Sequence, residues 1–89
     1  MQPSVRSFAI TTTDTLHAVT AYWGGSVRSA GTITAVLIRR GTVTGTVIDA
    51  FSPPINTTDS HQLNAPVGAP EGVFADVDAN TTVCIVWAE

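Results

Sequence analysis

The chain has 89 residues, a length typical of one domain, with a net charge of −3 and only 12% charged residues. A typical soluble domain has about 25% charged residues, roughly twice this fraction. All four basic residues are arginine, and lysine is absent. Too few cations are present to neutralise phosphates, and no apolar run reaches the roughly 18 residues of a membrane span. We therefore expect no nucleic-acid partner and no membrane partner. The first residues lack the apolar core of a signal peptide, so we expect synthesis in the cytoplasm.

The first third of the chain predicts two strands and a loop. Val5–Ile10 alternates in the manner of a short strand, and the polar residues Thr11–Thr15 break it. Leu16–Trp23 is rich in β-branched and aromatic residues, which favours a strand over a helix. Gly24–Gly31 is bounded by glycines at both ends and predicts a loop or a wide hairpin turn.

The most hydrophobic and β-branched part of the sequence is Thr32–Ala50. It predicts a hairpin of two strands, Thr32–Arg39 and Thr42–Ala50, around a turn signal at Arg39-Arg40-Gly41. Gly45 interrupts the second strand and indicates a bulge or a close approach of the backbone. We expect the rest of the domain to pack on this pair.

The segment from Phe51 to Gly72 holds four of the five prolines and little periodicity. It is long for a loop without structure in a compact domain. It is either a crossover between two sheets, with one short strand near His61–Leu63, or a loop ordered by a neighbouring subunit. We expect Pro53–Pro70 to be mobile in an isolated subunit and fixed in an assembly.

The C-terminal part predicts a second hairpin, made of Val73–Val77 and Thr82–Ala88 around a turn at Asp78-Ala79-Asn80. The last strand is apolar on both faces, so it should be central or covered on both sides. No segment has the pattern and caps of a helix. The expected fold is a single all-β domain spanning 1–89, a small antiparallel β-sandwich or barrel of Greek-key or jelly-roll kind with six to seven strands.

Two patterns suggest a metal, and neither is complete. The run from Asp76 to Asn80 has the spacing that opens an EF-hand loop. However, the glycine needed at the sixth position is Thr81, and the glutamate needed at the twelfth is Trp87. The second pattern is two histidines that lack the close spacing of metal ligands, namely His17 and His61 with Asp14 or Asp59 as partners. We expect no metal and no cofactor.

No residue pattern predicts catalysis. Cys84 stands in an apolar run, so we expect a buried thiol with a raised pKa that does not act as a nucleophile. The serines at 52 and 60 lack the G-x-S-x-G context of a hydrolase. Glu71 and Asp76 are the nearest to a pair of glycosidase carboxylates, and nothing in the sequence brings them together. We expect that the protein is not an enzyme.

The candidate interface residues are three aromatics and two arginines: Trp23, Tyr22, Arg39, Arg40 and Trp87. Large rings are typical of core positions and interface anchors, and also of sugar-binding platforms. The arginine pair predicts a solvated turn, or a contact with an acidic patch on a neighbour.

The strand faces carry threonine, serine, alanine and valine where free monomers usually place charge or lysine. Interface cores are depleted in charge in the same way. We therefore expect an obligate homo-oligomer, with a cyclic trimer favoured over a larger array.

In composition and in runs such as Thr32–Ala50 and Gly72–Trp87, the chain resembles small structural proteins of bacteriophage virions. These are the capsid decoration (cement) proteins and the head-fibre or tail β-modules. The resemblance implies a mechanical function in the virion, with the major capsid protein or another virion protein as partner. The alternative is a carbohydrate- or ligand-binding β-sandwich for adhesion. A lectin should expose Trp23 or Trp87 beside polar side chains, whereas a cement protein should bury these rings.

Overall fold

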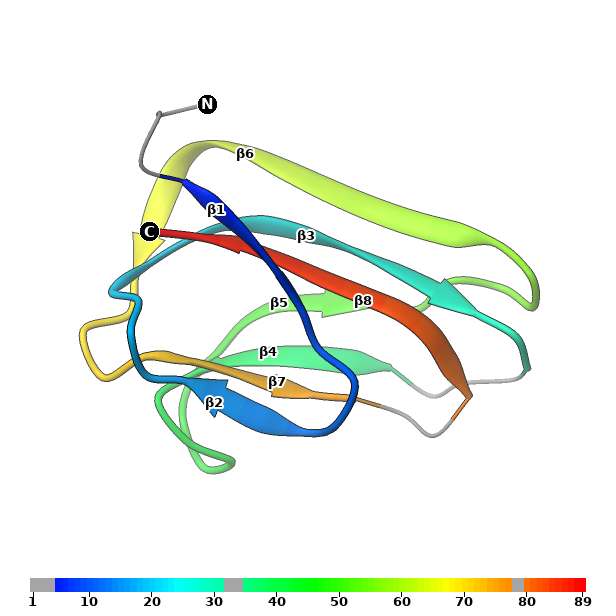
Figure 1. Ribbon diagram of the computed structural model, residues 1–89, viewed down its shortest axis with the longest axis horizontal. Helices are drawn as coiled ribbons and strands as arrows, with labels where there is room; N and C mark the ends of the chain where they lie inside the picture. The colour runs from blue at the N-terminus through cyan, green and yellow to red at the C-terminus, as the bar shows by residue number, and fades with distance from the viewer. Residues whose placement is uncertain (1–4, 32–34, 78–79) are drawn as a thin grey trace.

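The computed structural model describes residues 5–31, 35–77 and 80–89, which form eight strands in two antiparallel sheets of four (Figure 1). The first sheet has the strand order β1-β8-β3-β6, and the second has the order β2-β7-β4-β5. The strands of the first sheet are β1 (Arg6–Ala9), β3 (Ala21–Ser29), β6 (Thr58–Gly68) and β8 (Thr81–Ala88). The strands of the second sheet are β2 (Asp14–Leu16), β4 (Val36–Arg40), β5 (Val47–Phe51) and β7 (Val73–Asp76).

The chain crosses from one sheet to the other at every connection except the one between β4 and β5. This connectivity, with its two sheet orders, is that of an eight-stranded jelly roll. The predicted all-β class and the sandwich are therefore confirmed, with eight strands in place of six or seven. The last strand is central, as predicted, because β8 lies between β1 and β3.

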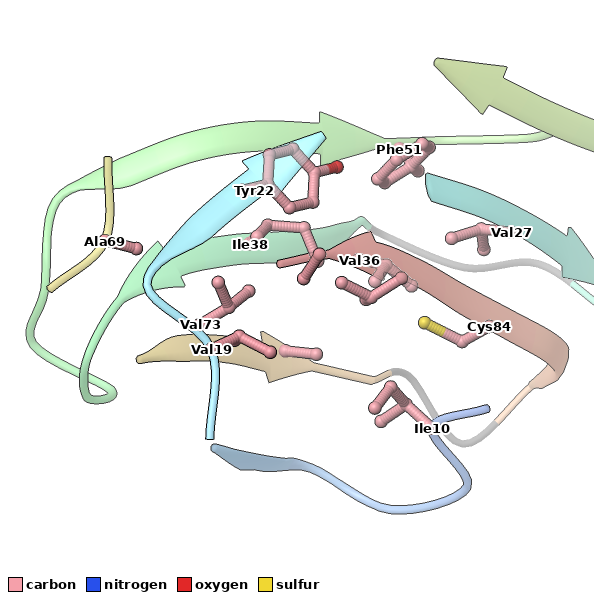
Figure 2. Close-up of a cluster of buried hydrophobic side chains, with 13 residues drawn as sticks. Ile10, Val19, Tyr22, Val27, Val36, Ile38, Phe51, Ala69, Val73 and Cys84 are labelled. Atoms are coloured by element: carbon pink, nitrogen blue, oxygen red, sulfur yellow. The ribbon is translucent and has the colours of Figure 1, made fainter. Parts of the chain in front are cut away.

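The core lies between the two sheets, and both sheets contribute side chains to it (Figure 2). In β8 the buried positions are Cys84, Val86 and Ala88, while the residues between them are more exposed. This period of two is the one expected for a strand that covers a core with one face. The largest fully buried side chains are Tyr22, Phe51, Ile38, Val19, Val27, Val36, Val73 and Val86.

The predicted strand Leu16–Trp23 is wrong, since β2 ends at Leu16, residues 17–20 turn, and β3 begins at Ala21. The predicted loop Gly24–Gly31 is also wrong, because most of it lies inside β3. Its two leading glycines serve close packing of strands and not a turn. A Cβ at Gly24 would overlap the carbonyl oxygen of His61, and one at Gly25 would lie 2.6 Å from the carbonyl oxygen of Ile85.

About half of the predicted connection 51–72 is strand β6. This strand has 11 residues and lies at the edge of the first sheet, where Thr58–Gln62, Val67 and Gly68 pair antiparallel with β3. The single short strand expected at His61–Leu63 is therefore far too short. The expected change of Pro53–Pro70 between free and assembled subunits stays a prediction.

Of the two predicted hairpins, one is present. Strands β4 and β5 pair with each other, with Leu37 opposite Ala50, although residues 42–46 form the turn and not the start of the strand. Residues 32–34 of the predicted first strand lie outside the described residues. A Cβ at Gly45 would overlap the carbonyl oxygen of Arg40, so the predicted close approach is confirmed.

The predicted C-terminal hairpin is wrong, because its two strands belong to opposite sheets. Strand β7 pairs with β2 and β4, whereas β8 pairs with β1 and β3. A lone hairpin would leave the core-facing residues of both strands uncovered, whereas in opposite sheets these residues are buried in the core between them. Residues 78–79 of the predicted turn lie outside the described residues.

Candidate functional site

A polar cluster joins the two sheets on the side where β5 and β6, the edge strands of opposite sheets, contact each other. We call it the edge cluster; it consists of Tyr22, Asp49, Phe51, Asp59 and His61. Nδ1 of His61, on β6, lies 2.8 Å from Oδ1 of Asp49, on β5. This contact links strands that share no backbone pairing.

The carboxylate of Asp49 accepts hydrogen bonds from both sheets. The Tyr22 hydroxyl donates to Oδ2 over 2.7 Å, and the backbone N–H of Ala50 donates to Oδ1 over 2.8 Å. Burial, followed by the hydrogen bond to Asp49 and its charge, raises the pKa of Tyr22 far above the ordinary value. Tyr22 is therefore a neutral phenol that serves as a donor at any physiological pH.

The imidazole of His61 is fixed on several sides. Its Nε2 lies 3.3 Å from Oδ1 of Asp59, which precedes it by two residues on the same face of β6. The Phe51 ring stacks on the imidazole with centroids 4.4 Å apart and planes 19° from parallel. The side chain remains 34% exposed, so water reaches the pair with Asp59.

The edge cluster was only partly foreseen from the sequence. His61 and Asp59, named as possible metal partners, do meet, but as an ion pair that also includes Asp49. In the described part of the chain, no three metal-ligating side chains converge on one point. The other histidine, His17, is exposed, and the side chain of Asp14 lies outside the described residues. Asp49 was missed, although an acid between Ile48 and Phe51 in an otherwise apolar run was a signal.

The aromatic interface candidates are more buried than a binding platform would be. Tyr22 is wholly inside the core and offers no surface to a partner. Trp23 is 8% exposed, and its Nε1 donates to Oε2 of Glu89 over 2.9 Å. Trp87 is half-buried on the outside of the first sheet.

The two arginines differ. Nη1 of Arg39 donates to the carbonyl oxygen of Gly45 over 3.0 Å, and its buried Nε has no partner among the described residues. Arg40 is exposed and borders a hollow of about 300 Å³ that Glu71 also lines. Of the two, Arg40 is therefore the one that presents its charged group at the surface.

The outward side of the first sheet is almost uncharged. The register places Ser7, Trp87, Gly24 and Gln62 in one row across the four strands. Val83 is 43% exposed, and Ile85 is half-buried. Among the described residues that the register places on this surface, only Arg28 is charged. We call this surface the outer face; its members are Ser7, Ala9, Ser26, Arg28, Thr58, Ser60, Gln62, Val83, Ile85 and Trp87.

A hollow of about 310 Å³ lies beside Trp23 where β3 and β6 lose their register. Tyr22 pairs with Val67 and Gly24 pairs with Gln62, so residues 63–66 of β6 stand opposite Trp23 alone. Such a bulge on an edge strand directs side chains out of the regular pleat. The hollow is lined by Trp23, Gln62, Leu63 and Asn64.

Comparisons of the chain with models of protein families, with curated proteins and with solved structures found no match. Within residues 5–31, 35–77 and 80–89 there is no helix with the length and apolarity to cross a membrane.

Proposed function

We propose that the protein is a non-enzymatic structural subunit of a virion that assembles with copies of itself through the outer face. In this role it decorates and cements a capsid, or forms part of a fibre. The observation that carries the proposal is the composition of the outer face. A broad sheet surface with Val83, Ile85 and Trp87 among serines and a single arginine is typical of an interface core, which excludes charge.

The free edges of the first sheet support the same proposal. Strand β6 is 11 residues long and carries Asp59 as its one acidic residue, with no lysine to discourage pairing. Pro66 and the bulge at 63–66 interrupt the part near Trp23, which leaves Thr58–Gln62 regular. A monomer with such an edge and such a face is prone to aggregation, and burial between subunits removes both liabilities.

The oligomer is tested by light scattering after size exclusion at micromolar concentration, with two valine variants. Val83→Arg places a charge on the outer face, and Val47→Arg places the same charge at a site of equal exposure, 43%, on β5 of the other sheet. We expect an oligomer for the wild type and Val47→Arg, and a smaller species for Val83→Arg. A wild-type monomer at these concentrations would contradict the proposal.

The virion location is tested by co-sedimentation of the purified protein with particles that lack it. Saturable binding to the particles supports a decoration role, and Val83→Arg should reduce it if neighbouring subunits cooperate on the shell. Absence of the protein from purified virions, together with no binding to stripped particles, would contradict the location while leaving the oligomer intact.

The second candidate function is carbohydrate binding at the hollow beside Trp23. The amides of Gln62 and Asn64 are exposed next to an indole, which is a combination suited to hydroxyl groups and a sugar ring. Trp23 exposes only 8% of its surface, so it offers an edge and not an open stacking platform. A glycan array with wild type and Gln62→Ala decides this function. Binding that Gln62→Ala abolishes would establish the hollow as a sugar site.

A further inference from the structure

The proton on Nδ1 of His61 follows from its neighbours. Oδ1 of Asp49, 2.8 Å away, belongs to a carboxylate that already accepts from the Tyr22 hydroxyl and the Ala50 N–H. An ionised carboxylate only accepts hydrogen bonds. The contact with His61 is therefore a hydrogen bond in which Nδ1–H is the donor.

The other ring nitrogen faces a second acceptor. Nε2 of His61 lies 3.3 Å from Oδ1 of Asp59. A neutral imidazole carries one N–H, which Asp49 already uses, so its Nε2 presents a lone pair to the Asp59 carboxylate. A protonated imidazolium instead donates to Asp49 and Asp59 together, and both bonds are charge-assisted.

We propose that His61 is a proton-operated latch between the two sheets. When the ring is protonated it ties Asp49 on β5 to Asp59 on β6 and closes the sandwich at this edge. When the ring is neutral the contact with Asp59 is lost, while the contact with Asp49 remains. Stacking on Phe51 keeps the ring in one plane, so the ring does not turn away to find another partner.

Among the described residues, no cationic side chain contacts Asp49 or Asp59 in competition with His61. Tyr22, from β3, is a neutral donor to Asp49. The nearest cation in the β3–β6 register is Arg28, which lies on the outer face and whose Nη1 donates to Thr58 over 3.4 Å. The two carboxylates therefore act on His61 without a competing cation.

The sign of the pH effect follows directly. Histidine changes charge between about pH 5 and pH 8, and the extra contact exists only in the charged form. The edge is therefore tighter at the acidic end of this range and looser at the alkaline end. Because His61 and Asp59 are each about one third exposed, solvent screening limits the effect to a roughly two- to fivefold change in local opening.

Hydrogen exchange of β6 at about pH 5.5 and about pH 8, corrected for intrinsic rates, measures this opening. In the wild type we expect the amides near Asp59 and His61 to open about two- to fivefold more at the higher pH. Asp59→Asn should reduce this difference, since it removes one of the two charge-assisted bonds of the imidazolium while the bond to Asp49 remains. His17→Gln, which removes the exposed histidine, should leave the difference unchanged.

Nitrogen NMR of the wild-type rings gives a second readout that does not depend on any variant folding. We expect the neutral ring of His61 to carry its proton on Nδ1, and the charged ring to carry the second proton on Nε2. A neutral His61 with its proton on Nε2 would overturn the latch. An equal pH response of β6 in wild type and Asp59→Asn would also overturn it. The position of the proton on the His61 ring does not depend on the oligomeric state.

Discussion

The hydroxyl of Tyr22 and the carboxylate of Asp49 connect the core of one sheet to the edge of the other through a hydrogen bond of 2.7 Å. Tyr22 is fully buried, and its ring packs among the apolar side chains between the sheets (Figure 2). Asp49 lies inward because it stands opposite Ile38, which is also fully buried. The hydrogen bond from Tyr22 therefore holds the carboxylate of Asp49 at the boundary of the core.

Replacement of Tyr22 by Phe should destabilise the fold by about 1–3 kcal/mol, because it removes a donor from a partly buried carboxylate. The ring and its packing are retained, so the loss reports the hydroxyl. Urea denaturation measures it, and a cycle with Asp49→Ala should give a clear coupling between the two side chains. Additive effects of the two substitutions would contradict the role given to this bond.

Gly24→Ala should destabilise the protein strongly, by about 2 kcal/mol or more. Gly24 has a φ of 127° and its backbone lies against the His61 carbonyl oxygen, so a methyl group is both strained and obstructed. Gly68→Ala is the matched control, because a Cβ at this position, at one end of the same strand pair, would meet no atom within 4 Å. Thermal unfolding of the two variants should separate them clearly, and equal stabilities would show that the glycine at 24 is dispensable.

Cys84 should be nearly inert toward thiol reagents in the folded protein. Burial raises its pKa to about 11, and the side chain lies in the core. At neutral pH the reactive thiolate is therefore scarce as well as covered. Labelling with a chromogenic disulfide should proceed only as fast as the protein opens, and should become rapid in urea. Fast labelling without denaturant would contradict the burial.

Stability should fall as the pH rises from about 9 to about 11. In this range the unfolded chain loses the Cys84 proton at its ordinary pKa of 9.0, while the folded chain, with a pKa of about 11, retains it. The native state then binds more protons, so the free energy of unfolding decreases with pH. Cys84→Ala should flatten part of this decrease in a series of urea titrations. Tyr22, whose pKa is raised in the same direction, should sustain the decrease at higher pH.

Assembly should shield Trp87 much more than Trp23. Trp87 lies half-buried on the outer face, whereas Trp23 is already buried within the subunit, with 8% of its surface exposed. Acrylamide quenching of single-tryptophan variants, Trp23→Phe and Trp87→Phe, should therefore change with concentration only in the variant that keeps Trp87. Quenching of Trp87 that is unaffected by concentration would place the subunit contact elsewhere.

The parts of the fold that could be predicted are those where one signal dominates. The β4–β5 hairpin follows from two β-branched runs around Gly41, and the central position of β8 follows from a strand that is apolar on both faces. Gly24 and Gly25 misled the prediction, because glycine at a close backbone approach and glycine in a turn look the same in sequence. The polar strand β6 was also missed. An edge strand buries only one face, so its sequence lacks the hydrophobic run that predicts a strand.

The edge cluster could not be predicted, because its members come from three strands that are distant in the chain. His61 and Asp59 are two residues apart, but Asp49 and Tyr22 reach them only through the jelly-roll connections. Local sequence patterns do not predict which strands lie at the edges of the two sheets. An isolated acid within an apolar strand, as in Asp49, was the available hint that a buried donor must face it.

The pairing of β1 with β8, in which Arg6 lies opposite Ala88, has a consequence for how the protein matures on the ribosome. Strand β8, which follows the other seven strands in the chain, fills the middle of the first sheet, so β1 and β3 have no shared neighbour until it emerges (Figure 1). A nascent or truncated chain that lacks β8 therefore has two open strand edges, and its core lacks Cys84, Val86 and Ala88. Folding should complete only after β8 has emerged, slowly and in one step, and chains stalled before that point should be efficient substrates for chaperones.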